Sequence, residues 1–169
     1  MINRTILKDL QEALAVFPVV LLCGARQVGK STLVLSLCEH YITLDDITQL
    51  DGARADPKRF IQDLPRPIVI DEIQKAPELL PAIKEEVDRK RKNGDFLLTG
   101  SANLLGYKKV TESLAGRMGV MELLPLSCRE MANRADANLA DDLFSAEWPN
   151  NKTPQSSNLL LDSLLQGGY

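Results

Sequence analysis

The sequence predicts an α/β fold in which a five-stranded parallel sheet lies between two layers of helices. Short apolar runs of strand length alternate along the chain with longer segments whose apolar residues recur at helical spacing. These runs hold consecutive valine, isoleucine and leucine residues, which is typical of parallel strands buried on both faces. The first run leads directly into a glycine-rich loop and then a helix, the context of a phosphate-binding loop. The expected architecture is therefore the three-layer fold of P-loop nucleotide-binding proteins.

The individual elements follow from the apolar pattern and its interruptions. The expected strands cover residues 19–23, 41–44, 68–71, 96–99 and 120–124. The first expected helices cover residues 3–15, the stretch from the glycine-rich loop to about residue 39, and two pieces that Asp56-Pro57 separates. The next runs from Pro77 to Asn93-Gly94, and another ends at Leu114. The last begins at the capping-box sequence Ser127-Cys128-Arg129-Glu130. Right-handed crossovers between parallel strands place these helices on both faces of the sheet.

Residues 24–31 read Gly-Ala-Arg-Gln-Val-Gly-Lys-Ser, the full phosphate-binding loop pattern. Gly24 and Gly29 permit backbone angles that a side chain would forbid, so successive N–H groups can turn inward and form a nest for an anion. The following helix directs its positive end at the phosphates. Lys30 is expected to reach the β- and γ-phosphates, and Ser31 to ligate Mg²⁺. The expected nucleotide-binding residues are Gly24, Ala25, Arg26, Gln27, Val28, Gly29, Lys30, Ser31 and Thr32.

An acidic pair follows the strand expected at residues 68–71. Asp71 ends this strand and would lie beside the phosphate loop if the two strands neighbour each other. It is then expected to hold Mg²⁺, directly or through a water, and Glu72 is expected to polarise an attacking water. A small-molecule kinase needs no such glutamate, since its acceptor hydroxyl replaces the water. The alternative is that both acids only cap the next helix, whose dipole favours negative charge at its start.

Size and composition restrict the class of protein further. The chain has 169 residues, enough for one domain with a sizeable core. Its net charge of −3 argues against a dedicated nucleic-acid surface, and the basic run at residues 89–92 is typical of a solvated helix end. The three cysteines lack metal-ligand spacing, and a single histidine, His40, argues against a catalytic triad or a His-based metal site. No apolar run approaches 18 residues, so we expect a cytoplasmic protein that does not enter a membrane.

The chain is expected to divide into four parts. Residues 1–16 form an N-terminal helix, residues 17–134 the core with the phosphate loop, and residues 135–157 a polar linker rich in Pro, Asn and Ser. Residues 158–169 have a leucine-rich helical face with little left to pack against. They are therefore expected to begin a C-terminal region that continues beyond Tyr169, or to be covered by another chain.

The stretch from residue 17 to residue 130 resembles a prokaryotic family of predicted AAA+ ATPases, which are P-loop proteins of the ASCE type. The matching motifs are residues 24–31, Leu44-Asp45-Asp46, Ile70-Asp71-Glu72-Ile73-Gln74-Lys75, Leu98-Thr99-Gly100-Ser101 and Ser113-Leu114-Ala115-Gly116-Arg117. In that family the ATPase core precedes a C-terminal domain of unknown function. Relatives continue into it past a Gly-Gly-aromatic sequence like residues 167–169, so the resemblance implies a truncated chain.

The resemblance implies two further site residues and a mode of assembly. Ser101 falls where this superfamily places a polar sensor of the γ-phosphate, with Thr99 as second choice; the alternative is a small residue that a tight turn requires. Arg117 falls where relatives carry an arginine finger that acts on the nucleotide of a neighbouring subunit; the alternative is a surface arginine after a turn. The implied partners are ATP or ADP, further copies of the chain through Arg117, and an unidentified protein.

These observations favour an ATPase that hydrolyses ATP to ADP and phosphate with Mg²⁺, with weak turnover in a truncated chain. Water attacks the γ-phosphate, Lys30, Mg²⁺ and Arg117 absorb negative charge, and Glu72 orients the water. A nucleotide-dependent switch with negligible turnover is the alternative. A small-molecule kinase is a third hypothesis, because Asp45-Asp46 ends the second strand, where kinases can hold an acceptor hydroxyl. Glu72 argues against the kinase.

Overall fold

The computed structural model describes residues 2–101 and 114–131 of the chain. Most of the expected helix ending at Leu114, the expected linker at residues 135–157 and the segment at residues 158–169 lie outside these ranges. The chain divides into two compact units. Residues 6–123 form the larger unit, and residues 1–5 group with residues 124–169 in the smaller one.

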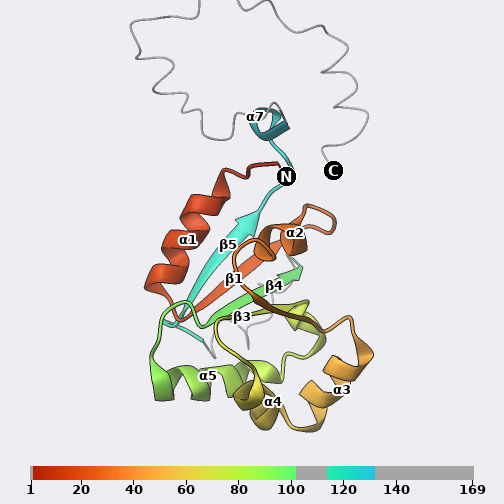
Figure 1. The fold of residues 1–169 in the computed structure, drawn as a ribbon, viewed down its shortest axis with the longest axis vertical. Coiled ribbons are helices and arrows are strands. Elements are labelled where there is room, and N and C mark those ends of the chain that lie inside the picture. Colours follow the sequence, from red (N-terminus) through yellow and green to blue (C-terminus); the bar gives the residue numbers. More distant parts are fainter. Residues whose placement is uncertain (1, 102–113, 132–169) are drawn as a thin grey trace, which may run out of the picture. The chain divides into compact units, whose positions relative to one another are not determined.

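The larger unit contains a five-stranded sheet in which all paired strands run parallel (Figure 1). The strands are β1 (Val19–Gly24), β2 (His40–Thr43), β3 (Ile68–Asp71), β4 (Phe96–Ser101) and β5 (Met118–Leu123). Their order across the sheet is β2-β3-β4-β1-β5, so β4 separates β1 from β3. The three central strands are buried along almost their whole length, as their consecutive apolar residues require. The predicted five-stranded parallel sheet is confirmed.

Helices cover both faces of this sheet. They are α1 (Ile6–Val16), α2 (Lys30–Val34), α3 (Ile47–Ala55), α4 (Pro57–Asp63) and α5 (Leu79–Lys90). Val20 and Leu22 of β1 share a core with α1 and α2, whereas Val19 and Leu21 share the opposite core with α3, α4 and α5. Successive side chains of a strand point to opposite faces, so one buried strand supplies both cores. None of the described helices is long and apolar enough to cross a membrane.

The helix after the glycine-rich loop is shorter than the sequence pattern predicts. It ends at Val34 rather than near residue 39. The N–H groups of Ser36 and Leu37 bond to carbonyls three residues back, and the Ser36 hydroxyl donates to the Leu33 carbonyl oxygen at 2.6 Å. A serine side chain that competes for a helix carbonyl weakens the helical ladder, so the α-helix gives way to tighter turns. The expected end of this helix is therefore wrong.

Other boundaries differ by a few residues. α1 begins at Ile6 rather than residue 3, and β5 begins at Met118 rather than residue 120. A short 3₁₀ turn, η1 (Ile73–Lys75), precedes α5, which begins at Leu79 rather than at Pro77. Apolar spacing marks the buried part of an element, whereas hydrogen bonds and backbone angles fix its ends.

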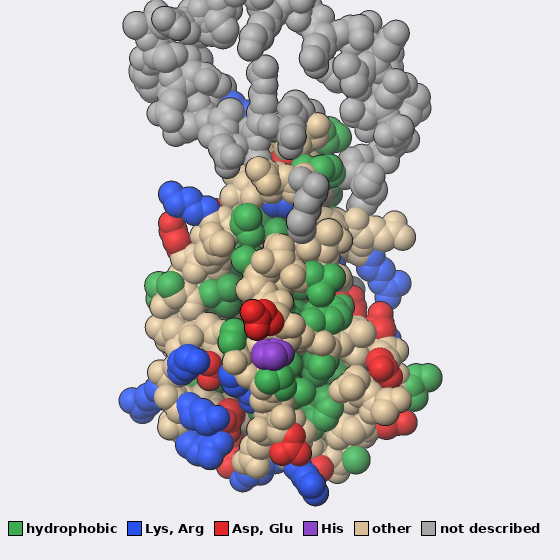
Figure 2. All heavy atoms as spheres, in the orientation of Figure 1, with side chains coloured by type: hydrophobic (Ala, Val, Ile, Leu, Met, Phe, Trp, Pro, Cys, Tyr) green, Lys and Arg blue, Asp and Glu red, His purple; other side chains and the backbone are tan. Residues whose placement is uncertain are grey.

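The basic cluster at the end of α5 is paired with acidic side chains. Arg89 and Lys90 lie 2.6 and 2.9 Å from the carboxylate oxygens of the buried Glu86, and Lys92 lies 3.6 Å from Asp95. In Figure 2, basic side chains gather at the lower left, over α5. Cations in the last turn of a helix interact favourably with its dipole. The expectation of a solvated helix end agrees with these contacts.

In the described part of the smaller unit, Glu130 of α7 (Cys128–Met131) bonds to residues from both ends of the described chain. Its Oε2 accepts hydrogen bonds from the Ser127 N–H and hydroxyl, and its own N–H donates to Ser127 Oγ, which confirms the predicted capping box. Its Oε1 accepts from the Thr5 N–H at 2.8 Å and from Arg4 Nε at 3.1 Å. Burial raises the pKa of Glu130, but these hydrogen bonds and Arg4 outweigh it, so its pKa lies below the ordinary value. The carboxylate therefore ties the start of the chain to the segment after β5.

Replacing Leu21 by alanine tests the central position of β1. Leu21 is fully buried, and removal of a buried leucine side chain typically costs about 2–5 kcal/mol of stability. We expect a loss of this size in the free energy of unfolding measured by urea denaturation. The matched control is Leu35→Ala, whose side chain is 55% exposed and should change stability by less than about 0.5 kcal/mol. Similar losses for both variants would contradict the assignment of Leu21 to the core.

Candidate functional site

The glycine-rich loop connects the end of β1 to the start of α2. A Cβ atom on Gly24 would lie 2.4 Å from the backbone oxygen of Leu123 in β5, which is closer than any side chain can approach. Gly29 precedes α2 with φ 91°, and Gln27 also has a positive φ of 64°. A loop in which left-handed residues interrupt right-handed ones is the backbone arrangement that forms anion nests.

A cavity of 670 Å³ opens beside this loop. It is lined by Arg26, Gln27, Gly29, Lys30, Ser31, Thr32, Asp45, Glu72, Gln74 and Lys75. Six of the nine residues expected to bind the nucleotide are in this set. Of the other three, Val28 packs into the core beneath the loop, and Gly24 and Ala25 present backbone carbonyls to Lys30. The loop and the residues after β3 therefore face a common space.

Lys30 is buried at the start of α2, although it carries a charge. Its Nζ donates hydrogen bonds to the carbonyl oxygens of Gly24 at 3.0 Å and Ala25 at 2.7 Å, and the residue is 7% exposed. A buried ammonium group with two neutral acceptors retains a strong preference for an anion. Lys30 is thus held at the wall of the cavity, where phosphate oxygens would meet it.

Asp71 contacts the phosphate loop, although its strand does not neighbour β1. The condition that the two strands neighbour each other is not met, because β4 lies between them. The contact is made instead by Ser31 in the first turn of α2, whose hydroxyl donates to Asp71 Oδ2 at 2.9 Å. The helix N-terminus overhangs β4 and reaches the end of β3, so the two expected Mg²⁺ ligands lie together.

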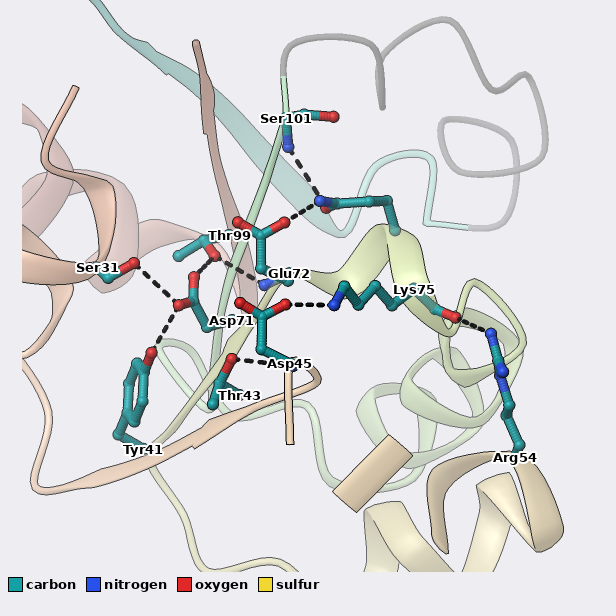
Figure 3. A network of polar contacts seen from close by, with 11 residues as sticks. Ser31, Tyr41, Thr43, Asp45, Arg54, Asp71, Glu72, Lys75, Thr99 and Ser101 are labelled. Atoms are coloured by element: carbon teal, nitrogen blue, oxygen red, sulfur yellow. Dashed lines mark hydrogen bonds and ion pairs between the residues drawn. The ribbon is translucent and has the colours of Figure 1, made fainter. Parts of the chain in front are cut away.

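The Asp71 carboxylate is 4% exposed and accepts hydrogen bonds from hydroxyl groups (Figure 3). Tyr41 donates to Oδ2 at 2.6 Å beside Ser31, and Thr99 donates to Oδ1. Among the described residues, no Lys or Arg side chain forms an ion pair with it. A buried carboxylate that lacks a cationic partner is costly, and a divalent cation would supply the missing positive charge. The donor set of Asp71 and Ser31 oxygens suits Mg²⁺.

Tyr41 remains a hydrogen-bond donor over the whole physiological pH range. Burial raises the pKa of its phenol first, and the hydrogen bond and negative charge of Asp71 add to this effect, so that the pKa is about 12. The protonated hydroxyl group is therefore a permanent neighbour of the carboxylate.

Glu72 follows Asp71 in a left-handed conformation with φ 60° and ψ 43°. Such angles cost a non-glycine residue about 1–3 kcal/mol, and residues with them are enriched at functional sites. The Glu72 N–H donates to Thr99 Oγ1 at 3.1 Å, and the carboxylate accepts a hydrogen bond from Gln74 Nε2. The bend after β3 brings the Glu72 side chain into the wall of the cavity.

The two residues expected as sensors of the γ-phosphate occupy different positions on β4. Thr99 is fully buried, and its hydroxyl is bonded both to Asp71 and to the Glu72 backbone. Ser101 ends β4 beside Gly24 of β1, and its N–H donates to Gln74 Oε1 at 3.4 Å. Thr99 therefore supports the acidic pair, whereas Ser101 lies at the strand end next to the loop.

Asp45, a candidate for holding an acceptor hydroxyl, is paired with Lys75. Lys75 Nζ lies 2.5 Å from Asp45 Oδ1, and the Lys75 carbonyl oxygen accepts a hydrogen bond from Arg54 at 2.8 Å (Figure 3). The pair joins the segment after β2 to the turn after β3 at the rim of the cavity. An aspartate that is neutralised in this way is a poor base for an acceptor hydroxyl.

Arg117 lies at the amino ends of the strands, at the end of the sheet opposite the phosphate loop. It directly precedes β5, and its carbonyl oxygen accepts from the Val19 N–H at the start of β1. Its Nε forms an ion pair with Asp88 of α5. The phosphate loop leaves the other end of β1, so Arg117 does not line the cavity of its own chain.

Three residues make contacts in the site that no pattern in a single sequence predicts. Tyr41 occupies an ordinary position of an apolar strand, and Gln74 and Lys75 occupy a turn. The Tyr41–Asp71, Lys75–Asp45 and Gln74–Ser101 contacts form because the carboxyl ends of β2, β3 and β4 are neighbours, whereas the Gln74–Glu72 contact lies within one turn. The sequence motif around Asp71 contains Gln74 and Lys75, but it does not predict which side chains these two residues contact.

Comparison with known proteins agrees with this geometry. A family model described as an AAA domain matches residues 16–132. Uncharacterized proteins of Mycobacterium bovis and Mycobacterium tuberculosis are each 40% identical to the chain over 131 residues, 75% of the chain. The chain spans 29% of the length of each of these relatives. A Walker-type ATPase of Pyrococcus abyssi has a similar fold, with a TM-score of 0.53 and 19% identity over 77% of this chain and 55% of that chain.

Replacing Lys30 by alanine should weaken the binding of Mg-ATP roughly ten- to a hundredfold. The estimate follows because a hydrogen bond to a charged group contributes about 1.5–3 kcal/mol. A titration with a fluorescent ATP analogue measures the change. Lys58→Ala is the control, since it removes the same charge from an exposed pair with Glu85. Equal affinities of the wild type and Lys30→Ala would refute the role of Lys30 in the loop.

Proposed function

Because the chain belongs to the AAA domain family and has the fold of a P-loop ATPase, we propose that it hydrolyses ATP to ADP and phosphate with Mg²⁺. One observation carries the proposal. The glycine-rich loop, Lys30, Ser31 and Glu72 line one cavity, and Ser31 is hydrogen-bonded to the carboxylate of Asp71. The proposal takes these residues as the phosphate-binding loop, two metal ligands and a base.

In this proposal Ser31 and Asp71 hold Mg²⁺ with the nucleotide. The bound ion would neutralise charge on the phosphates and align the leaving group. Lys30 and the loop N–H groups bind the phosphate oxygens and stabilise the negative charge that develops on them. The support comes from the position of Lys30 and from a buried carboxylate whose described partners are all neutral hydroxyl groups.

Glu72 is the residue that we assign to the attacking water. Its carboxylate lies in the cavity wall, and it is held by Gln74 rather than neutralised by a basic side chain among the described residues. A carboxylate in this state can accept a proton or orient a water. The alternative role as a helix cap has less support, because no cap hydrogen bond is formed by its side chain.

A nucleotide-dependent switch with negligible turnover is the second candidate. This function is favoured by the position of Arg117. Arg117 lies at the amino ends of the strands and does not line the cavity of its own chain. An ATPase that needs this arginine would bind nucleotide as a single chain but turn over slowly. A multiple-turnover assay of phosphate release separates the two functions.

Arg117 is proposed to act on the nucleotide of a neighbouring copy. β1 has six residues, so its two ends lie roughly 17 Å apart at the usual rise per residue. This separation prevents Arg117 from reaching the phosphates of its own chain. A second copy whose cavity faces this edge would receive the guanidinium group.

Changing Glu72 to glutamine should preserve nucleotide binding and reduce turnover by about 10²- to 10⁴-fold, the usual contribution of a general base. The change keeps the shape of the side chain and removes its basicity. Phosphate release at saturating ATP is the measurement. Glu85→Gln, an exposed acid paired with Lys58, is the control and should leave turnover unchanged. Unchanged turnover in Glu72→Gln would leave Glu72 without a catalytic role, and lost binding would indicate a metal or structural role.

Mixing two inactive variants tests the proposed action of Arg117. Glu72→Gln retains the arginine, and Arg117→Ala retains the glutamate, so a mixed interface contains one complete site. We expect mixing to restore part of the turnover, and turnover per wild-type chain to rise with protein concentration. Full arginine fingers contribute about 10³- to 10⁵-fold, and we expect less here. Absence of recovery, with co-assembly shown by crosslinking, would leave Arg117 with its contacts to Asp88 and Ala115 within one chain.

A further inference from the structure

The Tyr41 hydroxyl group is the third donor to the proposed metal-binding carboxylate. Tyr41 lies in β2, one of the two edge strands of the described sheet, next to Val69 of β3. Its hydroxyl donates to Asp71 Oδ2 at 2.6 Å, on the same oxygen that Ser31 contacts at 2.9 Å (Figure 3). Thr99 of β4 bonds to the other oxygen, Oδ1. The carboxylate is therefore fixed from both neighbouring strands and from α2.

The three donors differ in what each one can contribute. Ser31 is itself an expected ligand of the ion, and Thr99 also supports the Glu72 backbone. Tyr41 has neither function, and its ring packs against the core shared by α1 and α2. A phenylalanine would fill the same space, so the packing does not require the hydroxyl group. The hydroxyl group instead bonds to Asp71, and it also interacts with the side chains of Thr43 and Ser31.

We propose that Tyr41 is a positioning residue that sets the affinity of the site for the divalent cation of the nucleotide complex. The proposal rests on the proposed function, in which Asp71 takes Mg²⁺. Hydrogen-bond partners of ligating carboxylates fix the direction of the ligand, and their loss typically costs 10- to 100-fold in metal affinity. Without Tyr41, Ser31 is the one described residue that still bonds to Asp71 Oδ2, and in this proposal Ser31 is also a ligand of the ion.

The experiment compares wild type, Tyr41→Phe and Ser36→Ala in the full chain. A fluorescent ATP analogue is titrated in EDTA and then at a series of Mg²⁺ concentrations, and Mn²⁺ binding in saturating ADP is followed by electron paramagnetic resonance. Ser36→Ala removes a hydroxyl group that bonds to the Leu33 carbonyl oxygen and does not contact Asp71. We expect Tyr41→Phe to keep the metal-free affinity within about twofold of wild type. The Mg²⁺ and Mn²⁺ concentrations for half-saturation should rise about 10- to 100-fold, whereas Ser36→Ala should match wild type.

The metal-free affinity separates positioning from folding. The role of Tyr41 would be overturned if Tyr41→Phe lowered the nucleotide affinity equally with and without metal. It would also be overturned if the metal concentrations for half-saturation did not change. A second comparison adds Tyr41→Phe to Asp71→Asn, where the hydroxyl group has no carboxylate to position. We expect no further change in metal dependence there, and an additional loss would again overturn the proposal. Wild type that binds no nucleotide, or binds it without metal dependence, would refute the proposed function itself, which distinguishes the two failures.

Discussion

The buried carboxylate of Asp71 is the group on which the arrangement of the site depends. It ends β3, and its hydrogen bonds join β3 to α2 through Ser31, to β2 through Tyr41 and to β4 through Thr99. A buried charge with neutral partners is tolerated only when its hydrogen bonds are well made. The same requirement fixes the start of α2 above the sheet, and with it the position of Lys30. The negative charge that the hydroxyl groups leave uncompensated is the reason to expect a cation between Asp71 and the phosphates.

The parallel sheet brings the phosphate loop and the residues around Asp71 together at the carboxyl ends of its strands. The strands run in the same direction, so Gly24, Asp71 and Ser101 each lie at or near the carboxyl end of a strand. β4 lies between β1 and β3, which separates the loop strand from the acidic strand by about 10 Å, or two strand spacings. This gap is bridged by Ser31 from above and by Thr99 from within the sheet. β4 thus contributes one of these hydroxyl contacts through Thr99, and α2 contributes the other through Ser31.

Much of this arrangement is predictable from the sequence, for physical reasons that differ between residues. The five strands and the loop follow from local patterns, because consecutive apolar residues and Gly-x-x-x-x-Gly-Lys-Ser constrain the chain within a few residues. The order of the strands does not follow from them, so these patterns could not decide whether β1 and β3 are neighbours. The contacts of Tyr41 and Gln74 also depend on which strand ends are neighbours. The early end of α2 coincides with backbone bonds from Ser36 and Leu37 to carbonyls three residues back and with a bond of the Ser36 hydroxyl, which apolar spacing does not reveal.

The position of Arg117 shows how the sheet limits what a single chain can do. The loop and the acidic pair occupy the carboxyl ends of the strands, and Arg117 occupies the amino end of β5, where it is paired with Asp88. A rigid parallel sheet keeps these two edges apart, since strand length fixes the distance between them. An arginine at the amino edge can therefore stabilise charge at the phosphates only if a second copy presents its carboxyl edge to it. The association would also have to replace the bond to Asp88, so catalysis through Arg117 would be coupled to the strength of the contact between copies.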